Sequence, residues 1–155
     1  MALLRQLKGS PAGCLVRVDC KPSRYSRLRF RLVVFRRQRD LCRYWRRAWP
    51  YACSLGRDCR GAVHELVEHR ERADGRRRTL RDPRLFCVIG LIQSHLTMRI
   101  ITHESVHAAL AYHRRVGRRS YAREFIAQME EEAICYPAGD IGRAICIELA
   151  KHELI

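Results

Sequence analysis

Two histidines with a glutamate between them carry the most specific chemistry in this sequence. His103 and His107 are four residues apart, and Glu104 directly follows the first of them. On a helix, residues i and i+4 lie on one face about one turn apart, so both imidazoles can reach the same metal ion. The glutamate borders that point and can take a proton from a water molecule. The pattern His-Glu-x-x-His therefore predicts a zinc site with a hydrolytic function.

A catalytic zinc ion needs a third protein ligand, and the sequence offers two places for it. His113 lies six residues after His107. On a continuous helix, six steps turn its side chain about 120° away from that of His107, so we expect His113 to point away from the metal. The other place is the acidic run 130–132. Adjacent helical residues point about 100° apart, so at most one of these carboxylates faces the metal well.

The order of these residues resembles that of the gluzincin metallopeptidases, especially the small single-domain members found in phages and bacteria. The resemblance rests on the pattern at 103–107, a turn at Gly117, and a helix bearing Glu132 three residues before Cys135. It covers about residues 85–140. In that family a glutamate on the next helix completes the zinc site. The resemblance thus implies Glu132 as the third ligand, with Glu131 as the alternative.

The same resemblance implies a zinc-dependent peptidase that acts on a peptide or protein substrate. Zinc would activate a water molecule and polarise the scissile carbonyl, while Glu104 would pass the water's proton to the leaving amine. Tyr136 would either stabilise the transition state through its hydroxyl or simply pack. In the family an extended substrate pairs with an edge strand above the metal-binding helix. Residues 84–92 or residues 62–69 offer such an edge.

The positive charge of the chain supports a different class of function. The formal net charge is +15, and only three of the 31 basic residues are lysines. A strong positive field attracts nucleic acid or other acidic partners. The alternative is a solvated arginine surface without a partner, since most of the arginines are spread over residues 24–123 and form no single stripe. A basic nucleic-acid-binding or host-interaction protein without proteolytic activity is therefore the second functional hypothesis.

The apolar pattern predicts one α+β domain. Residues 1–26 hold two glycines and two prolines and are expected to form an irregular arm. Residues 27–155 are expected to form a single zincin-like domain, with a short antiparallel sheet packed on a helix bundle, one helix of which carries the two histidines. Alternating or continuous apolar residues predict three strands, at 28–35, 62–69 and 85–92.

Helical spacing of apolar residues predicts the remaining elements. A first helix is expected at 40–48, and the helix with the two histidines runs from about residue 96 to Gly117. A further helix begins near Ser120 and is interrupted by Pro137 and Gly139, after which a last helix covers 141–152.

The cysteine pattern and the lack of long apolar runs suggest a cytoplasmic protein. The eight cysteines include no Cys-x-x-Cys pair, which argues against a zinc ribbon. No apolar run approaches the roughly 20 residues that cross a bilayer, and the first residues do not read as a secretory signal. We therefore expect free thiols and no membrane association.

Overall fold

The computed structural model describes residues 11–49, 59–66, 69–71, 77–79, 82–117 and 126–155; of 69–71, 77–79, 117 and 126–132 it describes the backbone alone. It confirms an α+β fold built on a four-stranded sheet in the order β1-β2-β6-β3. Its strands are β1 (Cys14–Cys20), β2 (Arg29–Phe35), β3 (Gly61–Glu65) and β6 (Leu85–Ile92). A separate two-stranded sheet pairs β4 (His69–Glu71) with β5 (Arg77–Thr79).

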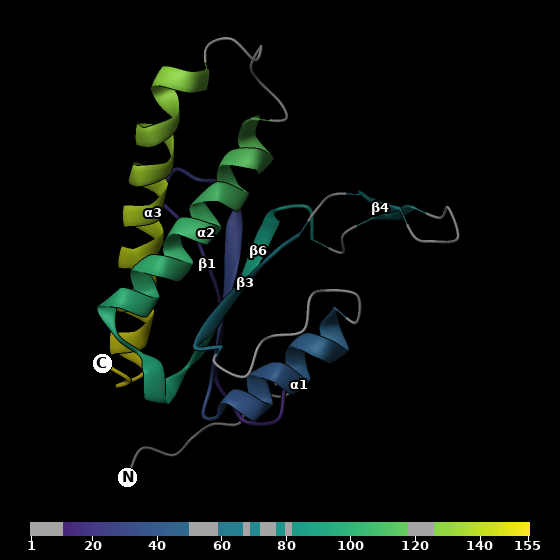
Figure 1. Ribbon diagram of the computed structural model, residues 1–155, viewed down its shortest axis with the longest axis vertical. Coiled ribbons are helices and arrows are strands. Elements are labelled where there is room, and N and C mark those ends of the chain that lie inside the picture. The colour runs from purple at the N-terminus through teal and green to yellow at the C-terminus, as the bar shows by residue number, and fades with distance from the viewer. Residues whose placement is uncertain (1–10, 50–58, 67–68, 72–76, 80–81, 118–125) are drawn as a thin grey trace.

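Helices cover both faces of the four-stranded sheet (Figure 1). On one face lies α1 (Gln38–Ala48). The other face is covered by α2 (Met98–Gly117) and α3 (Ile126–Lys151), which lie side by side. Residues 93–97, which include the 3-10 turn η1 (Gln93–His95), separate the end of β6 from the helix with the two histidines. The central strand of the sheet therefore fixes where α2 begins.

Side chains that alternate along the strands divide the core between these two faces. On β2, Phe30, Leu32 and Val34 face α2 and α3, whereas Val33 and Phe35 face α1. Successive residues of a strand point to opposite faces, so a strand covered on both sides has to be apolar throughout. β6 meets this condition, since all eight of its residues are buried. Its continuous apolar run is explained by this central position.

A glycine in β6 allows α1 to pack closely on the sheet. A Cβ atom built on Gly90 would lie 2.5 Å from Leu41 Cδ1 and 2.9 Å from Trp45 Cζ3. Both distances are shorter than carbon contacts permit. Leu41 and Trp45 of α1 therefore fill the space that a side chain at residue 90 would need.

The sheet differs from the expected one in two respects. Residues 14–20, predicted as part of an irregular arm, form β1 and pair with β2 in an antiparallel register. The sheet is mixed and not antiparallel, because β2 and β6 run parallel. The second of these features depends on a pairing between strands about 50 residues apart, which the local pattern of apolar residues does not encode.

Two predicted boundaries were also wrong. The strand expected at 62–69 ends at Glu65, and His69 belongs to β4 in the other sheet. The helix break expected at Pro137 and Gly139 does not occur, because α3 runs continuously through both residues. Proline removes one backbone hydrogen bond and costs about 3 kcal/mol inside a helix. The apolar face of α3 that packs against α2 and the sheet offsets this cost.

Within the described ranges, no helix has both the length and the apolar character needed to cross a membrane. The seven cysteines among the described residues are free thiols, as expected.

Candidate functional site

The two histidines of α2 meet at the surface of the molecule. Both side chains are exposed, and their Nε2 atoms lie 3.2 Å apart. Two nitrogen ligands about 2.05 Å from a tetrahedral zinc ion are about 3.3 Å from each other. The separation between His103 and His107 therefore fits two ligands of one zinc ion. The same distance also permits a hydrogen bond between a protonated and an unprotonated ring nitrogen.

Glu104 points to a different side of α2, towards the sheet. It is only 5% exposed. A Cβ atom built on Gly61, the first residue of β3, would lie 2.8 Å from Glu104 Oε1. Glycine at this position therefore leaves room for the carboxylate against the strand. Burial raises the pKa of the Glu104 carboxyl above its usual value, and the charge of the neighbouring His103 partly offsets that rise.

An ion pair shows which flank of α2 the histidines occupy. Arg114 Nη2 lies 2.7 Å from Glu65 Oε2 at the end of β3. Arg114 follows His107 by seven residues, which is two helical turns, so the two side chains leave α2 in nearly the same direction. Gly61 beside Glu104 and Glu65 beside Arg114 show that β3 runs along this part of α2. The histidine pair therefore lies on the flank next to β3.

This strand is at the edge of the four-stranded sheet. β3 pairs with β6 on one side, and no other described strand pairs with its second side. Unpaired N–H and C=O groups on an edge strand can accept an additional extended segment. The site therefore combines two exposed imidazoles at a separation that suits metal ligands, one buried carboxyl and a strand edge.

The helix α3 packs on the opposite flank of α2. A Cβ atom built on Gly142 would lie 3.3 Å from Ser105 Oγ, so these two residues mark where the helices touch. His103 and His107 are each two residues from Ser105, which turns them about 160° away from it around the helix axis. The histidine pair therefore faces away from α3.

The packing of α3 on α2 determines how near the predicted third ligand can lie to the histidine pair. The side chains of Glu131 and Glu132 lie outside the described residues. The backbone of Glu132 is in α3, ten residues before Gly142, and thus about 15 Å from the contact with Ser105 along the axis. The position of its backbone does not favour a shared site with the histidine pair. Ligation by Glu132 or Glu131 stays a prediction.

The other predicted site residues do not join the histidine pair in this arrangement. Tyr136 is 72% exposed and lies on α3, on the other side of α2. His113 is half-buried and, six residues after His107 on a continuous α2, points about 120° away from it, as expected. Among the described residues, no group of three or more His, Cys, Asp or Glu side chains is arranged to hold a metal ion.

Two features of this site were not predicted from the sequence. Gly61 contacts Glu104 across more than 40 residues of chain, and Glu65 pairs with Arg114. Gly61 stands directly before the strand predicted at 62–69, and this is the only signal of its role in the sequence.

Comparisons with protein-family models, with curated proteins and with solved structures give no match to this chain.

Proposed function

We propose that the chain is a zinc-dependent metallopeptidase, with His103 and His107 as metal ligands and Glu104 as the catalytic base. The observation that carries this proposal is the 3.2 Å separation of the two Nε2 atoms, which fits zinc ligation. A zinc ion held there would supply Lewis acidity to a water molecule and to a substrate carbonyl.

The residues of this chain have distinct tasks in the proposed reaction. The imidazoles hold the metal at the surface, where a substrate has access. Glu104 accepts the proton of the attacking water and delivers it to the leaving nitrogen. Its neighbour Gly61 supports this role, because the bare backbone of β3 lets the carboxylate lie against the strand.

The proposed substrate is an extended peptide that pairs with β3. Of the two candidate edges, residues 85–92 form the central strand β6, which is paired on both sides. β3 is left as the edge beside the histidine pair. An extended segment on this edge would lie next to His107 and would be held chiefly by main-chain hydrogen bonds.

The metal content of the purified full chain tests the ligand assignment. We expect one equivalent of zinc in the unaltered protein and its loss in His103→Ala and in His107→Ala. His152→Ala is the matched control, because His152 is an exposed histidine near the end of the chain. Zinc retained in full by both variants of the pair would refute the site.

The third ligand needs its own measurement. Glu132→Ala and Glu131→Ala are compared for zinc affinity by competition with a chelator. A large loss for one of them identifies the ligand that the gluzincin resemblance implies. Unchanged affinity in both variants shows that another group completes the coordination, which is the outcome that the packing of α2 on α3 favours.

Cleavage of quenched fluorescent peptides tests the base. Glu104→Gln keeps the size of the side chain but cannot accept the proton. We expect this variant to bind zinc and to lose peptide cleavage by at least about 100-fold. Cleavage at the original rate would contradict the role given to Glu104.

A further inference from the structure

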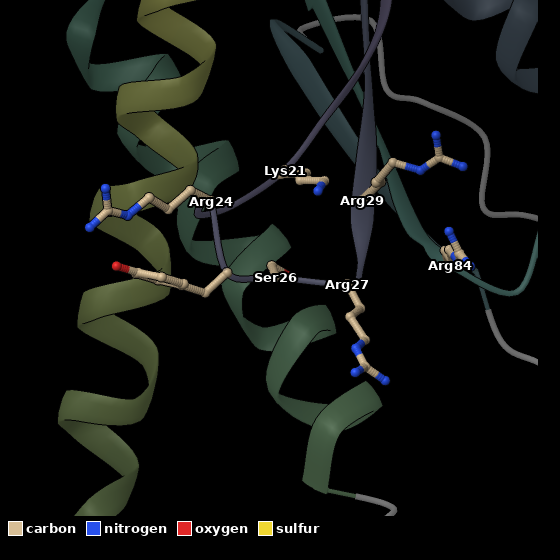
Figure 2. Close-up of a pocket in the computed structure, with 7 residues that line it drawn as sticks. Lys21, Arg24, Ser26, Arg27, Arg29 and Arg84 are labelled. Atoms are coloured by element: carbon tan, nitrogen blue, oxygen red, sulfur yellow. The ribbon is translucent and has the colours of Figure 1, made fainter.

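A pocket lined by positive charge lies at the turn between β1 and β2, distinct from the histidine pair. Its volume is about 400 Å³. Five of the seven lining residues are cationic and none is acidic (Figure 2). The lining consists of Lys21, Arg24, Tyr25, Ser26, Arg27, Arg29 and Arg84. Most of these residues belong to the turn itself, and Arg84 directly precedes β6.

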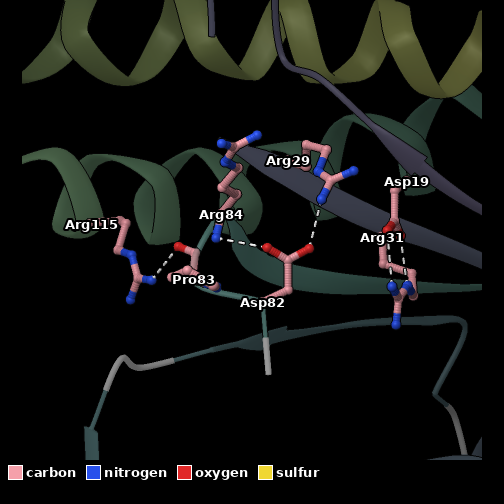
Figure 3. A network of polar contacts seen from close by, with 7 residues as sticks. All are labelled: Asp19, Arg29, Arg31, Asp82, Pro83, Arg84 and Arg115. Carbon is pink, nitrogen blue, oxygen red and sulfur yellow. Dashed lines mark hydrogen bonds and ion pairs between the residues drawn. The ribbon is translucent and has the colours of Figure 1, made fainter. Parts of the chain in front are cut away.

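Three described carboxylates lie near these cations, and one of them forms an ion pair with a lining residue. The other two, Asp19 and Glu148, line an adjoining pocket together with Lys21 and Arg24. Within the described part of the chain, one lining cation has an ion-pair partner. Arg29 Nη2 lies 2.7 Å from Asp82 Oδ2 (Figure 3). Asp82 also accepts a hydrogen bond from the backbone N–H of Arg84, at 2.9 Å. The seven lining residues and Asp82 together carry an excess of four positive charges, five minus one. Like charges at such density attract a multivalent anion.

An aromatic ring stands beside the cations. Tyr25 is 79% exposed, which is unusual for a side chain of its size. The guanidinium carbon of Arg24 lies 4.6 Å from the centre of its ring. Arg24 covers one face of this ring, and the high exposure of Tyr25 leaves the other face as a stacking surface for a planar base.

The turn that presents these groups is held in place by its own hydrogen bonds. The Ser26 N–H donates to the Ser23 carbonyl at 3.1 Å, and the Leu28 N–H donates to Ser26 Oγ at 3.1 Å. Ser26 itself is buried. A prearranged turn loses less conformational entropy when a ligand binds.

We propose that this pocket binds single-stranded nucleic acid, with the cations on the phosphates and Tyr25 stacked on a base. The combination of charge and an exposed ring selects a single strand, because the bases of a duplex are stacked on each other and are not accessible to a tyrosine ring. A polyanion without bases would use the cations but not Tyr25.

Fluorescence anisotropy with a labelled oligouridylate of about 12 nucleotides tests this proposal. The full chain is used with a chelator present, so that the result does not depend on the proposed zinc site. We expect Arg24→Glu and Arg27→Glu each to weaken binding by about tenfold or more and to reduce its salt dependence. Tyr25→Ala is expected to weaken binding by about fivefold or more through lost stacking.

Two further variants make the test specific to the pocket. Arg43→Glu is the matched control, because Arg43 is an exposed arginine on α1 and does not line the pocket. Asp82→Asn removes the negative charge next to Arg29 and keeps an oxygen for the Arg84 N–H, so we expect tighter binding. These exposed or partly exposed positions permit substitution without loss of the fold, which circular dichroism verifies.

Three results would overturn the proposal. The first is an equal effect of Arg43→Glu and Arg24→Glu, which would mean that net charge alone drives binding. The second is unchanged affinity in Tyr25→Ala. The third is binding of heparin or of an RNA duplex as tight as that of the single strand, because either would show a general affinity for polyanions.

Discussion

The contact between Gly61 and Glu104 yields a prediction whose size follows from the structure. A Cβ atom at residue 61 would lie 2.8 Å from Glu104 Oε1, 2.9 Å from its Cγ and 3.0 Å from its Cδ. In Gly61→Ala the side chain of Glu104 therefore has to move by about 0.5 Å or more. Overpacking of this kind costs about 1–3 kcal/mol. Alanine also gains about 0.5–1 kcal/mol over glycine in a strand, so the net loss is at most about 2.5 kcal/mol.

A double-mutant cycle isolates the contact from the effect of alanine on the backbone. Glu104→Ala removes all three atoms that the new methyl group would meet, so Gly61→Ala should stabilise that background by about 0.5–1 kcal/mol. The coupling free energy between the two sites is then about 1–3 kcal/mol. For a chain of this length each kcal/mol shifts Tm by about 2–4 °C. The coupling free energy is measured by thermal and urea unfolding, followed by circular dichroism. The four proteins compared are the unaltered chain, the two single variants and the double variant, all free of metal.

Additive effects within about 0.5 kcal/mol would refute the reasoning, since they would mean that Gly61 and Glu104 do not touch. If the chain is a peptidase as proposed, the same substitution also displaces the catalytic base. A shift of up to about 1 Å lowers kcat by up to about 100-fold, while the zinc content stays unchanged.

Three further predictions concern the fold. Gly90→Ala fills the space occupied by α1 and should cost about 1–3 kcal/mol, seen as a lower Tm; an unchanged Tm would contradict the close packing there. A hydrogen bond from Arg31 lowers the pKa of Asp19, so their cross-strand pair stabilises the protein above the ordinary carboxyl pKa and loses that effect as pH falls through the lowered pKa. Asp19→Asn should therefore cost about 1 kcal/mol near pH 7 and little in acid, as urea unfolding across pH will measure. Burial raises the pKa of the fully buried Cys87 thiol, so iodoacetamide should modify the exposed Cys135 first, as peptide mass mapping will show; early labelling of Cys87 would contradict its burial.

The elements that the sequence predicted well are those with a long, unbroken pattern. The apolar run at 85–92 became β6 with the same bounds, and the helix expected from about residue 96 to Gly117 is α2. In both cases a local signal and the tertiary packing agree. The pairing of His103 with His107 also needs only helical geometry, and the structure brings the two rings together.

The strand that was missed, β1, is stabilised by its pairing with β2. β1 contains Leu15, Val16 and Val18, which suit a strand, but it lies between Gly13 and Pro22, and these flanking turn residues led to the prediction of an irregular arm. It forms a strand because β2 provides hydrogen bonds and Arg31 pairs with Asp19. Such contacts between strands cannot be predicted from the residues of one strand alone.

The same limit applies to the candidate site. The sequence indicates which face of α2 bears the histidines, but not how α2 is rotated on the sheet. The observed rotation places the small residues Ala108, Ala109 and Ala111 in the core. It turns the histidines towards β3 and Ser105 towards α3, so a ligand on the next helix could not be judged from spacing alone.

The central place of β6 has a consequence for the order in which the molecule assembles. β1 and β2 form a hairpin within the first 35 residues. The second edge of β2 stays unpaired until β6, which begins at Leu85, has been synthesised. Until the ribosome has released that segment, the nascent hairpin exposes an apolar, unpaired border to neighbouring chains. A polypeptide truncated before Leu85 would therefore be prone to aggregation. Once β6 has been synthesised, it pairs with β2 and covers the exposed strand edge.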